Sequence, residues 1–315
     1  MHSQAAWPIL SETRGDGHGT GMKHKTLNAF LSGHRAALAK GPIAIILAED
    51  VTELESTVHH HIGLGFPTLL VLGAAAMTLS DDIVGDAPVQ LHRIDFDLHR
   101  PAATTRALNP LIEAMPAKVW AYYCYNAEYL FFPFCETRSI GELLSFHTEE
   151  RRFSMLSYVI DLYAGDLGQH PSGVDRDGAL FDKSGYYALA RLDPAKHNHP
   201  KDRQLDFFGG LRWRFEEHIP PGRRRIDRIG LFRAKPGLEL RDDHTFNDEE
   251  YNTYSCPWHH NLTCAIASFR VAKALKFNPG STFDIERFTW TNSARFEWSS
   301  QQLMDLGLME PGQWF

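Results

Sequence analysis

Short, continuously apolar runs alternate with segments of helical periodicity between residues 41 and 165. A run such as PIAIILA at 42–48 is typical of a strand that is buried on both faces of a sheet. Strands that alternate with helices predict a parallel, doubly wound sheet. We therefore expect an α/β fold with a Rossmann-type, mostly parallel sheet and flanking helices. The expected strands are 42–48, 68–73, 90–98 and 118–132, and the expected helices are 49–66 and 104–115.

The second half of the chain has a different pattern and predicts an α+β arrangement. A helix at 139–153 and a strand at 154–163 are followed by a polar stretch, 164–206, rich in Gly, Pro, Asp and His. A stretch of that length without a strong pattern is usually a functional lid or a variable insertion. A further helix is expected around 262–275. The chain is thus divided into a polar tail with one amphipathic helix (1–40), an α/β half (41–165) and a second half of the same domain (166–315).

Charge and cysteine content exclude several classes of protein. The 315 residues carry a net charge of −7, which argues against non-specific binding of nucleic acid. No apolar run approaches about 18 residues, so no membrane-spanning helix is expected. The N-terminus lacks the apolar segment of a secretory signal. The four cysteines are too few and too scattered for a disulfide framework, so a reducing, cytoplasmic location is expected.

Ligands of doubly wound sheets bind at the carboxyl ends of the strands. Acids or an amide stand at the ends of the expected strands 42–48, 90–98 and 118–132. Small residues stand at the end of the strand 68–73, at positions 73–76. One of the acids, Glu128, stands in the aromatic run YCYNAEYLFF at 123–132, where a carboxylate is costly to bury without a partner. The polar strand-end residues are Glu49, Asp50, Asp95, Asp97, Asn126 and Glu128.

Several short motifs occur one after another along the chain. They are His60-His61-x-x-Leu64-Gly65-Phe66, Trp120, Gly209-Gly210-x-Arg212-x-Arg214, an isolated His244, and Ser268-Phe269-Arg270 in place of His-Phe-Lys. This ordered set, from about residue 43 to about 275, resembles bacterial family-2-like glycosyltransferases, which have the nucleotide-sugar-binding GT-A fold. The resemblance makes 41–165 the nucleotide-sugar-binding half and 166–315 the acceptor side.

The chain departs from that family at the strand ends. The Asn-Glu pair of the family becomes Glu49-Asp50, and its Asp-Asn-x-Ser turn becomes the apolar stretch 73–76. Its metal-binding Asp-x-Asp-Glu-Phe becomes Tyr125-Asn126-Ala127-Glu128-Tyr129, so that both aspartates are absent and the glutamate remains. A divalent cation such as Mg²⁺ or Mn²⁺ prefers carboxylate oxygens, which a tyrosine and an alanine do not supply.

The resemblance implies an enzyme that transfers a sugar from a nucleotide-sugar to a hydroxyl acceptor with inversion, without the usual metal site. The alternative is a catalytically inactive GT-A-like binding or scaffold protein. Without the metal, the diphosphate charge falls to arginines, whose planar fork pairs with phosphate. Arg212 and Arg214 match the family pattern, whereas the run at 223–225 is either a further candidate or a solvated surface run.

Each remaining candidate has a functional and a structural interpretation. Glu128 is a general base, a ligand of a sugar hydroxyl, or a strand-end acid that reaches solvent or an arginine. Asp50 accepts a hydrogen bond from the nucleotide base, or caps the next helix. Asn126 belongs to the same nucleotide-sugar site, and His244 contacts a phosphate or the acceptor.

Three groups offer alternative metal ligands. Asp95 and Asp97 form a literal Asp-x-Asp and share one face if the strand includes both. Adjacent histidines at 59–61 point about 100° apart on a helix, so they favour packing over a shared metal. The third group consists of Cys256, His259, His260 and Cys264. A closed zinc site normally has two pairs of closely spaced ligands, and no second pair accompanies this group in the sequence.

Overall fold

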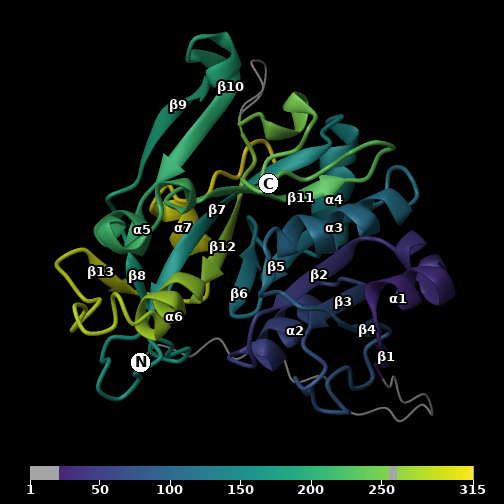
Figure 1. Cartoon of the computed structure of the whole chain (residues 1–315). Helices are drawn as coiled ribbons and strands as arrows, with labels where there is room; N and C mark the ends of the chain where they lie inside the picture. Colours follow the sequence, from purple (N-terminus) through teal and green to yellow (C-terminus); the bar gives the residue numbers. More distant parts are fainter. Residues whose placement is uncertain (1–20, 255–260, 315) are drawn as a thin grey trace.

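The computed structural model describes residues 21–254 and 261–314 and confirms the α/β class, with a large central sheet between helices (Figure 1). Within the sheet, β1, β4, β3, β2 and β5 lie side by side in this order, and all are parallel. The described chain therefore starts in the edge strand β1, crosses to β2 in the middle, returns through β3 to β4 beside β1, and crosses again to β5. The bounds are β1 (Met22–His24), β2 (Ile43–Ala48), β3 (Thr68–Gly73), β4 (Gln90–Asp95) and β5 (Trp120–Tyr125).

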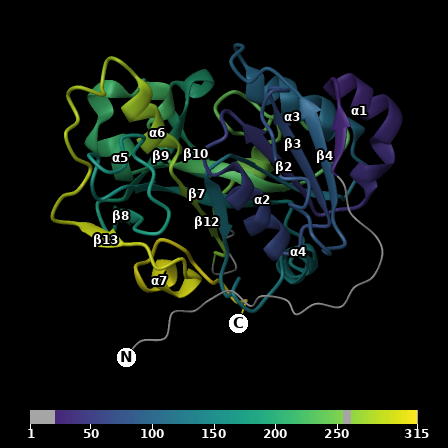
Figure 2. The ribbon, with the colours of Figure 1, turned by 90° about the horizontal axis from the view of Figure 1, so that it is seen from below.

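Helices cover both faces of this parallel core. Helix α2 (Leu54–Gly63) connects β2 to β3, and α3 (Ala103–Ala114) connects β4 to β5 in the opposite direction. Right-handed crossovers in opposite directions place their helices on opposite faces. Figure 2 shows α3 with α1 (Leu27–His34) on one side and α2 with α4 (Ile140–Glu149) on the other. Every residue of β2, β3 and β5 is therefore buried.

Strands β6 and β7, together with strands from the second half of the chain, extend the same sheet with mixed pairing. Strand β11 pairs antiparallel with β5 and β7, β12 pairs parallel with β7, and β6 closes the row. No described helix combines the length and apolar character needed to span a bilayer. The strands are β6 (Glu128–Phe131), β7 (Ser154–Tyr163), β8 (Leu180–Asp182), β11 (Asp227–Arg233), β12 (Cys264–Ser268) and β13 (Ser293–Arg295). The helices are α5 (Gly210–Arg214), α6 (Arg270–Phe277), α7 (Ser300–Asp305), and the 3₁₀ turns η1 (Arg35–Ala39), η2 (Pro194–Lys196), η3 (Glu216–His218), η4 (Pro221–Arg223) and η5 (Glu249–Asn252).

Two expected elements are wrong in detail. The single strand expected at 118–132 is two strands, because Ala127 adopts a positive φ of 60° and the chain turns there. The helix expected around 262–275 begins only at Arg270, and its first half is strand β12. All five residues of β12 are buried, and a short apolar run of this kind has no periodicity that separates strand from helix.

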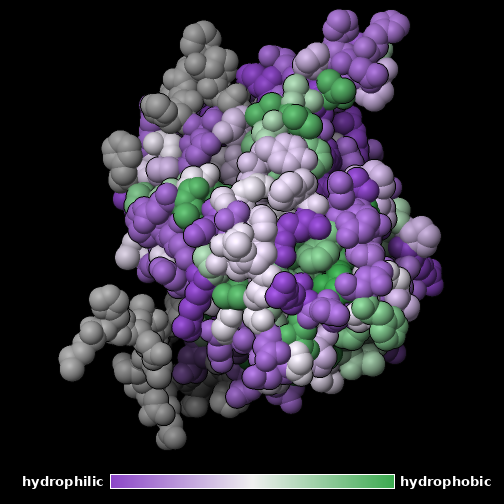
Figure 3. Space-filling model, turned by 90° about the vertical axis from the view of Figure 1, so that its left-hand side faces the viewer, coloured by the Kyte–Doolittle hydropathy of each residue, from purple (hydrophilic) through white to green (hydrophobic). Residues whose placement is uncertain are grey.

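A two-stranded ribbon projects from the second half. Strands β9 (Tyr187–Asp193) and β10 (His199–Phe208) pair antiparallel and extend beyond the main sheet at the top of Figure 1. Tyr187, Leu189 and Leu192 of this ribbon are exposed. Figure 3 shows hydrophobic residues among hydrophilic ones in this region. The polar stretch 164–206 thus contains β8, β9 and most of β10.

Candidate functional site

The carboxyl ends of β2 and β5 lie side by side, and a buried amide links the loops that follow them. Asn126 Oδ1 accepts a hydrogen bond from the Glu49 backbone N–H at 2.9 Å. Asn126 Nδ2 donates to Asp50 Oδ1 at 2.8 Å and to the Thr52 carbonyl at 2.9 Å. Asn126 is fully buried, so it positions both acids rather than presenting its own amide to a ligand.

Asp50 is held by a lysine from the second half of the chain. Lys273 Nζ lies 2.8 Å from Asp50 Oδ2, and the Thr52 backbone N–H donates to Asp50 Oδ1. Partial burial acts to raise the pKa of Asp50, but the Lys273 ammonium outweighs it and the pKa is lowered. The alternative that Asp50 caps the next helix is wrong, because α2 begins at Leu54 after an N-cap at Glu53.

Arg270, the first residue of α6, lies over this edge of the sheet. Its Nε and Nη2 donate to the two carboxylate oxygens of Glu49 at 2.7 and 2.6 Å. Its guanidinium carbon is 3.5 Å from the centroid of the Tyr125 ring, a close cation–π contact. Burial acts to raise the pKa of Glu49, and the Arg270 guanidinium more than offsets this and lowers it. Nη1 of Arg270 has no hydrogen bond to the described part of the chain and remains a donor.

Glu128 is the buried partner of a second arginine. Its side chain is 1% exposed, and Oε2 accepts hydrogen bonds from Arg228 Nη2 at 2.7 Å and from the Tyr125 backbone N–H at 2.9 Å. Oε1 accepts from Ser268 Oγ at 3.1 Å. The Arg228 guanidinium is 5.4 Å and 5.6 Å from the ring centroids of Tyr123 and Tyr125. Tyr125 therefore contacts both Arg228 and Arg270.

His244 joins this group from a loop of the second half. It has a positive φ of 63°, and its ring stacks on Tyr123 with Nδ1 2.9 Å from the Tyr123 hydroxyl. Burial and then the positive charges of Arg228 and Arg270 lower the pKa of His244 well below its usual value. The imidazole is therefore neutral at pH 7.

Arg212 lies close to the same charges, although it contacts a different acid. Its Nη1 donates to the Arg225 carbonyl at 2.7 Å, and its Nε is 3.4 Å from Asp161 Oδ1. Burial raises the pKa of the fully buried Asp161 to about 6, against the effect of Arg212. The charges of Arg228 and Arg270 also act on Arg212, so the three guanidinium groups form one cationic region.

Arg214 has different surroundings. Its Nη1 pairs with Asp182 at 3.0 Å, and its guanidinium lies 4.7 Å from the centroid of the Trp290 ring, beside the small hydrophobic cluster of α5 and α6. In the run at 223–225, Arg224 pairs with Glu216 and Arg225 with Asp206. The structure thus brings Arg212, but not Arg214, toward Glu128.

The other metal candidates do not converge. Strand β4 ends at Asp95, which accepts a bond from the Ala75 N–H at 3.2 Å, while Asp97 lies beyond the strand and pairs with Arg100. His61 is buried against the Thr57 carbonyl, and His60 bonds the Leu130 carbonyl. Cys264 is buried in β12, whereas Cys256, His259 and His260 lie outside the described residues. Among residues 21–254 and 261–314, no three His, Cys, Asp or Glu side chains are placed to hold a metal ion.

A cavity of about 320 Å³ continues along the same sheet edge from β2 toward β1. Its floor includes Ala48, Val71 and Gly73, and residues of α2 and of the loop 74–79 cover it. A Cβ on Gly73 would lie 2.8 Å from the Ala48 carbonyl oxygen, so a larger residue would crowd this wall. Three basic side chains and one acid line the cavity, and they are Lys23, Lys25, Arg93 and Asp95.

Sequence reasoning missed the cations that dominate the site. Arg270 ends the Ser268-Phe269-Arg270 motif, and a basic residue at that position is a signal of positive charge. Arg228 lies in the same basic run as the expected arginines, but it belongs to β11, where it is buried together with its neighbours on both sides. Lys273 follows Arg270 by three residues and therefore shares its helix face.

Comparisons with known proteins add little. No protein-family model matches the sequence, and a search of curated proteins finds no match. Among solved structures, the crystal structure of HddC from Yersinia pseudotuberculosis aligns with 74% of this chain and 79% of its own chain, at 9% identity and a TM-score of 0.28. So low a score carries no argument about fold or activity.

Proposed function

We propose that this chain is a glycosyltransferase-like protein of the GT-A type that binds the diphosphate of a nucleotide-sugar with arginines in place of a divalent metal. The observation that carries the proposal is Arg270, clamped by Glu49 and stacked on Tyr125 at the carboxyl ends of β2 and β5. Apart from the edge strand β1, the parallel strands β4, β3, β2 and β5 lie in the order 3-2-1-4 by sequence, so β2 and β5 flank the topological switch point. Open α/β sheets bind their ligands at that point.

The residues at the family's metal position do not fit a hard cation. Tyr125, Asn126 and Ala127 supply no carboxylate, and the Asn126 amide is fully used within the protein. The Arg270 guanidinium supplies a fixed positive charge instead, and its Nη1 forms no hydrogen bond within the described part of the chain. A guanidinium held in place by a carboxylate loses little conformational entropy when it binds phosphate.

In this proposal the residues expected from sequence take different parts. Asn126 and Asp50 fix the loop that carries Glu49, and Arg212 adds positive charge beside Arg228. His244, whose imidazole is neutral, offers an uncharged hydrogen-bonding group to the phosphate or to the acceptor. Glu128 keeps Arg228 beneath Tyr125, which makes it a positioning residue rather than a general base.

One observation favours the second candidate function, a binding protein without catalysis. Both carboxylate oxygens of Glu128 are occupied and the side chain is 1% exposed, so it is not poised to deprotonate a hydroxyl. A protein that binds a nucleotide-sugar through its diphosphate but does not cleave the bond to the sugar would fit this alternative. Hydrolysis or transfer of a radiolabelled sugar from the bound donor distinguishes the two.

The test is calorimetric titration with UDP and GDP, in EDTA and then with Mn²⁺. We expect one of them to bind in EDTA, with no gain from Mn²⁺. Arg270→Met should weaken binding about tenfold or more, since a charge-assisted hydrogen bond is lost. The control is Arg100→Met, an exposed arginine that pairs only with Asp97. Binding that requires Mn²⁺, or that is unchanged in Arg270→Met, contradicts the proposal.

A further inference from the structure

The cavity beside the proposed site has more cations than its own acids can neutralise. Lys23, Lys25 and Arg93 line it, and Asp95 is the one carboxylate among its lining residues. Neither Lys23 nor Arg93 forms an ion pair with any residue that the structure describes, and Asp95 accepts its hydrogen bond from a backbone N–H. Positive charge without a protein partner in a concave site attracts anions.

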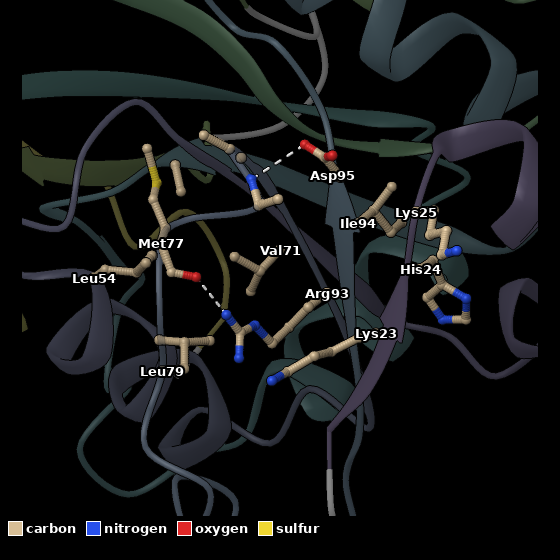
Figure 4. A pocket seen from close by; sticks show the side chains of 14 residues that line it. Lys23, His24, Lys25, Leu54, Val71, Met77, Leu79, Arg93, Ile94 and Asp95 are labelled. Carbon is tan, nitrogen blue, oxygen red and sulfur yellow. Dashed lines mark hydrogen bonds between the residues drawn. The ribbon is translucent and has the colours of Figure 1, made fainter.

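Lys23 and Arg93 lie directly beside one another. They are partners in the parallel register of β1 and β4, so their side chains leave the same face of the sheet. Figure 4 shows their nitrogen atoms side by side in the cavity, while Lys25 points away from the pair. Like charges that face each other across neighbouring strands are destabilising. An anion between them would remove that repulsion.

Much of the remaining lining is apolar. Leu54, Val71, Leu79 and Ile94 are buried around the same space, and the Arg93 guanidinium donates to the Met77 carbonyl at the cavity wall. A ligand that fills the cavity therefore needs an apolar or flat body together with an anionic group. Most small-molecule sites combine these features, with a largely apolar lining and a few convergent polar groups.

We propose that Lys23 and Arg93 form a phosphate-binding subsite for a ligand whose apolar body lies against Leu54, Val71 and Leu79. This subsite is separate from Arg270 and goes beyond the proposed function. Two sources supply the phosphate. One is a nucleotide whose diphosphate binds here rather than at Arg270, and the other is an independent phosphate monoester.

The experiment titrates phenyl phosphate, inorganic phosphate and UDP into the full chain and into Lys23→Met. Lys23 is exposed, so its substitution leaves the core intact. We expect phenyl phosphate or UDP to bind about tenfold more weakly to Lys23→Met, and binding to the wild-type chain to weaken as ionic strength rises. Arg93→Met should behave like Lys23→Met, whereas Arg93→Lys keeps the charge and most of the affinity. The control is Lys40→Met, which is also exposed and lies outside the cavity.

The outcomes separate the two sources and the two proposals. If UDP loses affinity in Lys23→Met but not in Arg270→Met, the diphosphate of the nucleotide binds at this subsite. If phenyl phosphate alone depends on Lys23, the subsite takes an independent ligand. Binding of every probe that is unchanged in both Lys23→Met and Arg93→Met, or absent from the wild-type chain, overturns the subsite. Arg270→Met reports on the proposed function alone.

Discussion

Removal of either partner of the Glu128–Arg228 pair tests whether this acid is structural. The two side chains are 1% and 4% exposed, and the Nη2–Oε2 distance is 2.7 Å. Arg228→Met leaves the Glu128 carboxylate with only Ser268 Oγ and the Tyr125 N–H as donors. Glu128→Gln leaves the guanidinium between Tyr123 and Tyr125 without an anion. Each change buries an uncompensated charge.

The expected loss in free energy of unfolding is about 3–5 kcal/mol for each single variant. The double variant Glu128→Gln, Arg228→Met contains neither charge, and its methionine fills much of the space that the arginine stem leaves. It should therefore lose less than the sum of the single variants, with a coupling energy of about 2–3 kcal/mol. Arg228 also makes two cation–π contacts, so part of its loss is independent of Glu128.

Guanidinium chloride unfolding, followed by circular dichroism, measures all four proteins of this cycle. The free energies are comparable only where the denaturant slope is unchanged among them. Losses below about 1 kcal/mol in both single variants, or losses that simply add, refute the structural role. Loss of sugar transfer in Glu128→Gln at unchanged stability would instead return Glu128 to the role of a general base.

Two further predictions concern stability. Burial, with a smaller effect of His24, lowers the pKa of His92 from 6.5 to about 4, so the folded state favours the neutral imidazole. The stabilisation from the neutral His92 is complete above pH 6.5 and is lost as pH falls toward 4, with a loss of about 2 kcal/mol by pH 5. Urea unfolding at pH 8 and at pH 5 measures this loss. The difference in the free energy of unfolding between the two pH values should be smaller in His92→Gln than in the wild-type chain. Gly210 has a φ of 62° and a Cβ there would lie 3.0 Å from Asp161 Oδ2, so Gly210→Ala should lower the free energy of unfolding by about 1–2 kcal/mol. The matched change Gly33→Ala, in a helix with open space around the new methyl group, should raise it by about 0.5–1 kcal/mol, and equal effects at the two sites would contradict this reasoning.

The parallel core could be predicted because its strands are short, apolar and separated by helices. Every residue of β2 and β3 is buried. A continuous apolar run therefore correctly predicts a strand that is covered on both faces of the sheet. The same rule fails at β12, where the apolar run continues directly into α6 and length does not separate the two. The turn at Ala127 escaped prediction for another reason, since a positive φ is rare for alanine and leaves no mark in the sequence.

For the candidate site, the strand ends indicated the acids and Asn126, and the resemblance indicated Arg212 and His244. Glu49, Asp50 and Asn126 follow strands, and the parallel register of β2 and β5 brings strand ends together. Their cations come from α6, more than 200 residues further along the chain, and no local pattern connects Arg270 to Glu49 or Lys273 to Asp50. Such pairs depend on how the second half of the sheet packs beside the first. That packing follows from long-range strand pairing rather than from periodicity.

The tyrosine at position 125 and the arginine at position 270 depend on each other. An aspartate at position 125 would place a carboxylate where the Tyr125 ring now lies beneath the guanidinium, next to Glu49 and Glu128. Three acids at one strand edge require a divalent cation to balance their charge. With tyrosine at 125, Glu49 is balanced by Arg270 and Glu128 by Arg228, and the Tyr125 ring lies close to both guanidinium groups. A metal ion at this position would therefore have to displace a guanidinium that already forms two hydrogen bonds with its carboxylate.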